Sequence, residues 1–310
     1  MAGSSGWHPR HDDPLFILAM DHRESFGRTL FGVEHDDPDA AQRAAMASAK
    51  QLIYEGLQSA LAAVTYGRAG VLVDERYGQG VIDAAKASGA PLVLAVPVEA
   101  SGHEWFTCEW GQRWLEHVEA IRPDYAKVLI RDNPGFGQRQ REEQFRRLAE
   151  VSTGLRDAGV PLLYELLVPA TDAQLGQAGQ DTGVYDRDIR PGLVAKVIAD
   201  NYAHGVEPAL WKVEGLETVE AARQVAGQAR AGGHQASLIV LGRDAPADRL
   251  HHWLAVASQV SDFVGFAIGR SIWEDAVRDY EASDHSQEAA HRARDRIAGR
   301  YLDFVGHWKR

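Results

Sequence analysis

The sequence has one cysteine, no long apolar run and no signal-peptide pattern, and each absence excludes a class of protein. Cys108 has no cysteine partner, so no disulfide forms within the chain, and a reducing cytoplasm is the expected location. No apolar run approaches the ~20 residues that a membrane-spanning helix needs, so no membrane partner is expected. Residues 1–14 lack the apolar core of a signal peptide and are expected to form a flexible lead-in.

Positive charge is also scarce. The 33 Lys and Arg residues face 44 Asp and Glu residues, which gives a formal net charge of −11. A chain of this sign repels nucleic acid, so we expect no nucleic-acid partner and look instead for a small molecule. A phosphorylated ligand would require Lys and Arg side chains gathered in one place.

Short apolar runs alternate with longer helical stretches along most of the chain. Continuous apolar runs of this length are typical of parallel strands buried on both faces. The first run leads into Asp21-His22-Arg23-Glu24, without the G-x-G-x-x-G turn of many open nucleotide-binding sheets. Eight strand–helix units therefore predict a (β/α)₈ TIM barrel. The predicted strands are residues 15–20, 70–74, 91–96, 125–130, 161–168, 209–213, 237–241 and 263–268.

The predicted domain is one barrel over residues 15–310, which includes an additional C-terminal helix at 286–310. This helix could cap the barrel or join a partner subunit, and we expect a homo-oligomer. Residues 170–189 are predicted to form a long polar loop directly after the fifth strand. The loop could be a lid over a substrate, but a subunit contact or plain disorder is an equal alternative.

Two lysines and one glutamate interrupt the apolar runs: Lys127 in the fourth strand, Glu165 in the fifth and Lys212 in the sixth. Burying an unpaired ammonium is costly, so inward-facing strand lysines are unusual. A second cation can lower the pKa of a lysine, and the neutral amine can then attack a carbonyl while a carboxylate moves protons. Alternatively, each lysine pairs with a nearby carboxylate or points outward between helices.

Gly-Arg pairs follow the seventh and eighth predicted strands, as Gly242-Arg243 and Gly269-Arg270. In many barrels these two loops bind phosphate through backbone N–H groups and a helix N-terminus. A glycine allows close backbone approach, and an arginine can bind phosphate with two parallel hydrogen bonds. The pairs predict a phosphate site, although a single Gly-Arg pair is more often a surface turn.

Several strand ends resemble one branch of the class I aldolases. The strings are AMDHRESF from Ala19, YAKVLI from Tyr125, LLYELLVP from Leu162, WKVEG from Trp211 and FAIGRSIW from Phe266. This branch contains tagatose-1,6-bisphosphate aldolase, the sulfofructose-phosphate aldolases and the aldolase-like domain of bacterial 5-dehydro-2-deoxygluconokinase in inositol catabolism. The strings VPVEASGHEWF and KVLIRDNP look most like that last domain.

The resemblance implies a metal-independent aldol cleavage, with no cofactor beyond the covalent lysine. It places Lys212 as the Schiff-base lysine, Lys127 as the second lysine, Glu165 as the acid/base carboxylate and Asp21 in the same cavity. The expected substrate is 2-deoxy-5-keto-gluconate 6-phosphate, cleaved to dihydroxyacetone phosphate and malonate semialdehyde. A sulfofructose phosphate or a ketose bisphosphate is the alternative. The distal group of the substrate is the carboxylate, sulfonate or phosphate at the end away from the bound phosphate. It could be held by Arg131, Arg23 or His103.

A metal-dependent enzyme, a cysteine enzyme and a non-catalytic barrel would each need different residues. A zinc-dependent aldolase needs several histidines with metal-ligand spacing at strand ends, and the 13 histidines form no H-x-H or H-E-x-x-H set. Cys108 has no matched His-Asn pair and is expected to be an inert cysteine. A sugar-phosphate-binding barrel without catalysis would not need both strand lysines and the glutamate. We therefore expect a lyase without a metal site.

Overall fold

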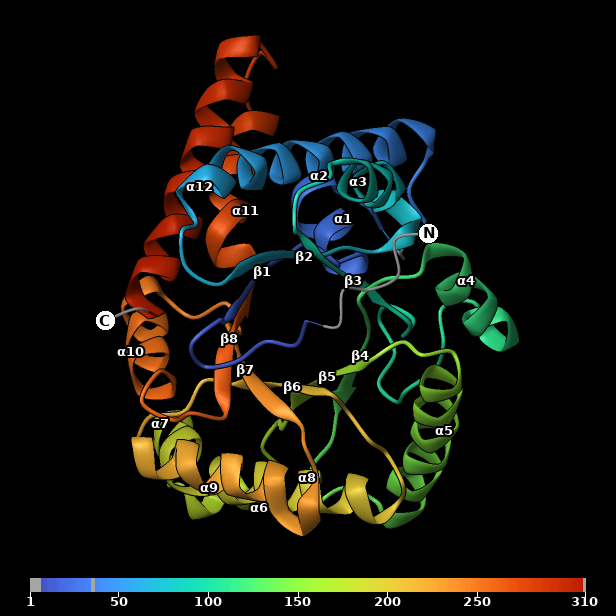
Figure 1. Ribbon diagram of the computed structural model, residues 1–310, viewed down its shortest axis with the longest axis vertical. Coiled ribbons are helices and arrows are strands. Elements are labelled where there is room, and N and C mark those ends of the chain that lie inside the picture. Colours follow the sequence, from blue (N-terminus) through green and yellow to red (C-terminus); the bar gives the residue numbers. More distant parts are fainter. Residues whose placement is uncertain (1–6, 35–36, 309–310) are drawn as a thin grey trace.

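The computed structural model describes residues 7–34 and 37–308, and within them eight parallel strands close into a barrel in chain order (Figure 1). The predicted TIM barrel is confirmed. The strands are β1 (Leu15–Ala19), β2 (Arg68–Leu72), β3 (Val93–Pro97), β4 (Tyr125–Arg131), β5 (Leu162–Leu167), β6 (Leu210–Glu214), β7 (Ser237–Leu241) and β8 (Phe263–Ile268).

Helices surround the barrel on all sides (Figure 1). Among the described helices, none combines the length and the apolar character that crossing a bilayer requires. The helices are α1 (Glu24–Phe31), α2 (Ala40–Ala60), α3 (Glu75–Ala87), α4 (Trp114–Ile121), α5 (Gln138–Asp157), α6 (Asp172–Gln177), α7 (Thr182–Val184), α8 (Arg190–Ala203), α9 (Val219–Arg230), α10 (Ala247–Ala257), α11 (Arg270–Glu281) and α12 (Gln287–Trp308). Short 3-10 turns are η1 (Leu61–Ala63), η2 (Gly111–Arg113) and η4 (Ala231–Gly233), and η3 (Tyr185–Ile189) is a π-helical turn.

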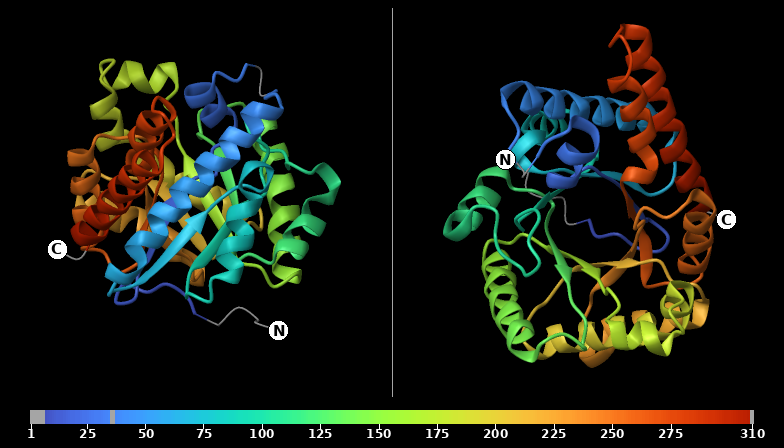
Figure 2. Two further views of the ribbon diagram at one scale, coloured as in Figure 1. Left: turned by 90° about the horizontal axis from the view of Figure 1, so that it is seen from above. Right: turned by 180° about the vertical axis from the view of Figure 1, so that it is seen from behind.

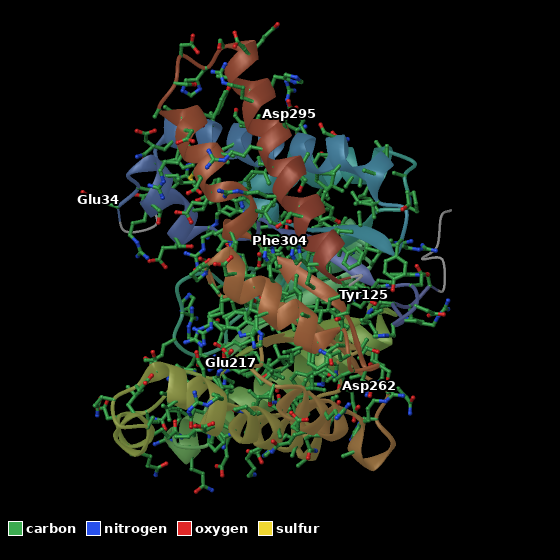
Figure 3. All side chains as sticks on the ribbon, turned by 90° about the vertical axis from the view of Figure 1, so that its left-hand side faces the viewer. Glu34, Tyr125, Glu217, Asp262, Asp295 and Phe304 are labelled. Atoms are coloured by element: carbon green, nitrogen blue, oxygen red, sulfur yellow. The ribbon has the colours of Figure 1, made fainter. Side chains whose placement is uncertain are left out.

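The C-terminal helix α12 lies along the outside of the barrel, and Figure 3 shows the face of the protein that carries it. Its Phe304 is buried and meets the ring of Phe266 on β8 with a centroid separation of 6.5 Å, while Asp295 is exposed. Tyr301 donates a hydrogen bond to the Phe16 carbonyl of β1 at 2.8 Å. The predicted tail helix is therefore present and packs on the barrel; residues 309–310 lie outside the described residues.

Alternate residues of each strand face the barrel axis, because side chains of a strand point to opposite sides in turn. In β1, Phe16 and Leu18 pack outward against the helices, while Leu15, Ile17 and Ala19 point inward. The inward residues form a separate apolar cluster that fills the lower part of the barrel. Its other members are Leu72, Val93, Ala95, Tyr125, Leu163, Leu210, Ile239, Val264 and Ala267.

The two ends of the barrel carry different segments (Figure 2, left). The N-terminal segment lies at one end, where the His11 imidazole contacts the Phe263 carbonyl at 3.3 Å and Trp7 packs against the inner apolar cluster. Helices α1 and α6 lie at the opposite end, into which the strands lead. Of the predicted lead-in at 1–14, residues 1–6 lie outside the described residues.

The prediction of a long polar loop at 170–189 is wrong, because most of this segment is helical. Thr171 forms a capping box with Gln174 at the start of α6, and the Asp181 side chain caps α7. Tyr185 is buried and donates a hydrogen bond to the Val168 carbonyl at 2.8 Å. The polar composition of the segment therefore reflects helix caps and a buried polar network.

Candidate active site

A cavity of about 430 Å³ opens at the end of the barrel to which the strands point, above the inner apolar cluster. Barrel enzymes place their catalytic groups at this end. No described residue of the segment 170–189 lines the cavity. All eleven residues predicted for catalysis or substrate binding line it: Asp21, Arg23, His103, Lys127, Arg131, Glu165, Lys212, Gly242, Arg243, Gly269 and Arg270.

The floor of the cavity is a cluster of buried charges around two lysines. The Lys127 ammonium contacts three carboxylates, those of Asp21 at 2.8 Å, Glu99 at 2.8 Å and Glu165 at 3.0 Å. Lys212 contacts one carboxylate among the described residues, the second oxygen of Glu165 at 2.8 Å. Glu165 therefore bridges the two lysines, which pair with it from the neighbouring strands β4 and β6.

These contacts fix the charge of several groups. Burial alone would lower the pKa of Lys127, but Asp21, Glu165 and Glu99 outweigh it, so the pKa is raised and Lys127 stays cationic. Burial alone would raise the pKa of Asp21 and of Glu165, but Lys127 and Lys212 hold both below their usual values. For Glu99 the balance is reversed: burial, helped by the charge of Asp21, raises its pKa despite Lys127 and Arg23.

Glu99 is the member of this cluster that was not among the eleven predicted site residues. It follows β3, where Val93 and Ala95 face the barrel axis, and it continues the same alternation two residues beyond Pro97. That period of two was visible in the sequence and could have identified it. A second missed residue is Lys50 of α2, which is fully buried.

Lys50 supports the turn that carries Asp21. Its ammonium donates to the carbonyls of Met20 at 2.6 Å and His22 at 2.9 Å, on either side of Asp21, and it pairs with Asp74. Lys50 does not line the cavity. It therefore positions the first strand end and has no access to a substrate.

The three candidates for the distal group of the substrate differ in their surroundings. Arg23 is buried and already paired with Glu99 at 3.3 Å and Glu109 at 3.1 Å. The side chains of Arg131 and His103 are exposed at the cavity wall, and neither has a hydrogen bond or ion pair within the described part of the chain. Arg131 stands four residues beyond Lys127 on the same inward face of β4, nearer the cavity mouth.

The predicted phosphate wall is formed by the loops after β7 and β8. A Cβ on Gly269 would lie 2.6 Å from the Ala19 carbonyl oxygen, so only glycine fits where this loop crosses β1. The Gly269 backbone leads directly into α11, whose N-terminus has no side-chain cap. Arg270 pairs with Asp244, and both line the cavity.

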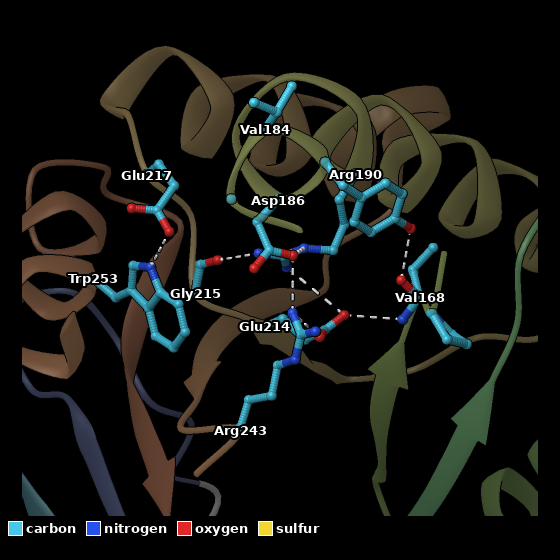
Figure 4. Close-up of polar contacts among 12 residues, drawn as sticks. Val168, Val184, Asp186, Arg190, Glu214, Gly215, Glu217, Arg243 and Trp253 are labelled. Carbon is cyan, nitrogen blue, oxygen red and sulfur yellow. Dashed lines mark hydrogen bonds and ion pairs between the residues drawn. The ribbon is translucent and has the colours of Figure 1, made fainter. Parts of the chain in front are cut away.

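Arg243 joins this wall to the helical segment after β5 (Figure 4). Its guanidinium contacts Asp186 at 2.9 Å and Glu214 at 3.0 Å, and Asp186 also accepts from Arg190 at 3.0 Å. Arg243 and Asp244 both have positive φ, at 48° and 52°, a left-handed conformation that residues other than glycine rarely adopt. Backbone strain of this kind is concentrated at functional sites.

His22 and His103, the two histidines that line the cavity, form no metal-spaced group with a third ligand among the described residues. Burial lowers the pKa of His22 to about 4, so its imidazole is neutral at pH 7. Within the described residues, the one trio spaced for a metal ion is His251, Asp303 and His307, on α10 and α12, and none of these lines the cavity. Burial raises the pKa of Cys108 to about 11, as for an unreactive thiol.

Comparisons with known proteins bear on this geometry. The family described as "Uncharacterized protein conserved in bacteria (DUF2090)" matches residues 5–310. No curated protein sequence matches the chain. Among solved structures, a fructose-bisphosphate aldolase from Plasmodium falciparum is similar with a TM-score of 0.64 and 12% identity, covering 94% of this chain and 90% of its own.

Two further similar structures are also aldolases. An archaeal fructose-1,6-bisphosphate aldolase, whose catalytic lysine is covalently bound to the carbinolamine intermediate of its substrate, has a TM-score of 0.52 and 14% identity, covering 93% of this chain and 95% of its own. A fructose-bisphosphate aldolase from Slackia heliotrinireducens has a TM-score of 0.52 and 12% identity, with coverages of 92% and 86%. At these identities the likeness shows a common fold.

Proposed function

We propose that this chain, which belongs to the DUF2090 family, is a class I aldolase that cleaves a phosphorylated keto-sugar or keto-sugar acid through a Schiff base on Lys212. The observation that carries the proposal is the asymmetry of the two buried lysines. Lys127 is held cationic by three carboxylates, whereas Lys212 shares a single carboxylate with it. A Schiff-base nucleophile must be a neutral amine, and of the two, Lys212 has fewer carboxylate partners to hold its proton.

The substrate phosphate is proposed to bind at Gly242, Arg243, Gly269 and Arg270. The N-terminus of α11 and the two arginines supply positive potential, and the glycines allow close approach. Both arginines already carry carboxylate partners, so the phosphate shares them with Asp186, Glu214 and Asp244. The two arginines and the helix N-terminus are gathered here, as an acidic protein needs in order to hold an anionic ligand.

With the phosphate held, the substrate ketone lies over the cavity floor. Lys212 attacks the carbonyl carbon, and Glu165, 2.8 Å from the lysine nitrogen, transfers the proton that allows the carbinolamine to lose water. The iminium withdraws the electron pair of the breaking carbon–carbon bond and becomes an enamine of dihydroxyacetone phosphate. Protonation of the enamine carbon regenerates an iminium, and hydrolysis of this iminium releases dihydroxyacetone phosphate and frees Lys212. Lys127 stays cationic beside this site.

The aldehyde fragment is proposed to carry a second anionic group, held by Arg131 with His103 beside it. Arg131 is favoured over Arg23 because its guanidinium has no ion-pair partner within the described residues, whereas Arg23 has two. A carboxylate at this end corresponds to 2-deoxy-5-keto-gluconate 6-phosphate, the substrate that we propose first. A sulfofructose phosphate or a ketose bisphosphate would place a sulfonate or phosphate there.

Reductive trapping tests the proposed chemistry. Borohydride added in the presence of dihydroxyacetone phosphate is expected to reduce the iminium to a stable secondary amine, which mass mapping locates on the peptide that contains Lys212. Lys212 is buried on β6 but lines the cavity, so the small phosphate reaches it. If no adduct forms and a chelator abolishes the aldolase activity, a metal-dependent reaction replaces this proposal. Binding without an adduct or turnover would point to a non-catalytic sugar-phosphate-binding barrel.

Substitution of Arg131 tests the proposed distal group. We expect Arg131→Gln to raise KM for a substrate with anionic groups at both ends by about 10- to 100-fold, the loss of one or two charge-assisted hydrogen bonds. Trapping of dihydroxyacetone phosphate, which lacks the distal group, is expected to stay unchanged. Arg28→Gln is the matched control, since Arg28 also lines the cavity but pairs with Glu24 at 3.0 Å. An equal effect of the two variants would contradict the assignment.

A further inference from the structure

The buried carboxylate of Glu99, part of the charged floor of the cavity, has one oxygen without a hydrogen-bond partner among the described residues. Its Oε1 accepts from Lys127 at 2.8 Å and from Arg23 at 3.3 Å, while its Oε2 is buried without a hydrogen-bond partner among the described residues. An unsatisfied buried carboxylate oxygen is costly in a protein interior and often marks a functional group. Because Glu99 lines the cavity, a substrate hydroxyl is the partner that this oxygen can gain.

The backbone around Glu99 is held firmly. Glu99 pairs with Cys108 in a short antiparallel bridge, Ala100 donates to the Thr107 carbonyl at 2.8 Å, and Glu109 donates to the Val98 carbonyl at 2.9 Å. Glu99 therefore stands on a fixed strand end and not on a free loop, which is the support that a catalytic group needs.

We propose that Glu99 is the base that takes the proton from the substrate hydroxyl on the carbon that leaves as the aldehyde. The inference rests on the proposed Schiff-base function. As the carbon–carbon bond breaks, its electron pair passes to the iminium, which becomes an enamine. The hydroxyl oxygen forms the carbonyl double bond of the aldehyde, and its proton moves to Glu99. In the condensation direction, Glu99 returns that proton to the aldehyde oxygen.

The charges around the floor support this division of labour. When Lys212 gives its proton to Glu165, Lys127 and Arg23 are two cations beside the carboxylates of Asp21 and Glu99. Forming an iminium from a neutral amine and a ketone consumes one proton, releases water and places a positive charge at Lys212. Once Glu165 has delivered that proton, the iminium is a third cation beside three carboxylates, and Glu99 is ionised at the stage that needs a base.

The other two carboxylates are less suited to the task. Glu165 lies between two lysines, with both oxygens in ion pairs, and its pKa is below the usual value. The pKa of Asp21 is also below the usual value for an aspartate, because Lys127 and Lys212 outweigh its burial. Environments that push neighbouring carboxyl pKa values apart are typical of sites that assign different proton-transfer roles to them. Glu99, with its raised pKa, is the strongest base of the three.

The test separates Schiff-base formation from the carbon–carbon step. Glu99→Gln is expected to keep the borohydride adduct of dihydroxyacetone phosphate on Lys212 and to lower condensation with malonate semialdehyde or glyceraldehyde 3-phosphate by about 10²-fold or more. Glu99→Asp is expected to recover part of that rate. Glu109→Gln is the matched control, because Glu109 also pairs with Arg23 but does not line the cavity, and it is expected to retain the condensation rate.

Other outcomes overturn the assignment in distinct ways. Unchanged condensation in Glu99→Gln, or loss of the adduct together with condensation, would remove Glu99 from this step. An equal loss in Glu109→Gln would trace the effect to Arg23. A selective loss in Asp21→Asn with none in Glu99→Gln would give the role to Asp21. Absence of an adduct in the unsubstituted protein would instead contradict the Schiff-base proposal itself.

Discussion

Lys212→Met is expected to abolish reductive trapping of dihydroxyacetone phosphate and to lower aldol cleavage by at least about 10⁴-fold, the scale seen when a covalent nucleophile is removed. Methionine matches the length of the lysine chain and suits a buried position, but it has no amine to attack the ketone. Glu165 keeps Lys127 as an ion-pair partner at 3.0 Å, so the variant is expected to fold. Mass mapping after borohydride treatment and a cleavage assay measure the two effects.

Two further variants make this result specific. Lys212→Arg keeps a positive charge beside Glu165 but cannot form a Schiff base, so it is expected to be as inactive as the methionine variant. Lys196→Met changes a lysine on α8 that lies outside the cavity and is exposed, and it is expected to leave both assays unchanged. An adduct that persists in Lys212→Met and maps to Lys127 would reverse the proposed roles of the two lysines.

The fold could be predicted from the sequence because its determinants are local and repeated. Each apolar run is a strand, and the lengths of the intervening helical stretches admit a closed parallel barrel. The segment 170–189 misled the prediction because its polar residues are helix caps and partners in a buried network. Asp186 is an example: it accepts hydrogen bonds from Arg190, Arg243 and Arg249, and these three arginines come from separate elements.

The predicted site residues all line one cavity because the strand ends of a barrel necessarily meet. What the sequence could not supply is which charges touch. In the sequence, Arg23 and Arg131 are both arginines near strand ends and cannot be distinguished. In the structure, Arg23 is paired with Glu99 and Glu109, whereas Arg131 is exposed. The support of Asp21 by Lys50 likewise depends on the packing of α2 under the first strand end. Such long-range pairings have no periodic signature.

Lys127→Met is expected to lower the free energy of unfolding by about 3–5 kcal/mol at pH 7, the range for removing one partner of a buried ion pair. Lys127 is 1% exposed, and its loss leaves Asp21, Glu99 and Glu165 close together without the cation that each of them contacts. Mutual repulsion and burial then raise their pKa values. Aldolase activity is expected to fall at least 10²-fold, because Glu165 and Glu99 lose their shared hydrogen-bond donor.

The pH dependence distinguishes this electrostatic cause from a simple packing defect. In the unsubstituted protein, the lowered pKa values of Asp21 and Glu165 stabilise the fold above the unfolded carboxyl pKa of about 4, and that contribution is lost as the pH falls through the folded values. In Lys127→Met the carboxyl pKa values are raised, so its stability increases as the pH falls. The difference between the two proteins, measured by urea unfolding, is therefore expected to shrink from pH 7 to pH 5. The double variant Lys127→Met/Glu99→Gln removes one of the three carboxylate charges and is expected to regain part of the stability at pH 7. A stability deficit that is equal at both pH values, and that the second substitution does not change, would indicate lost packing alone.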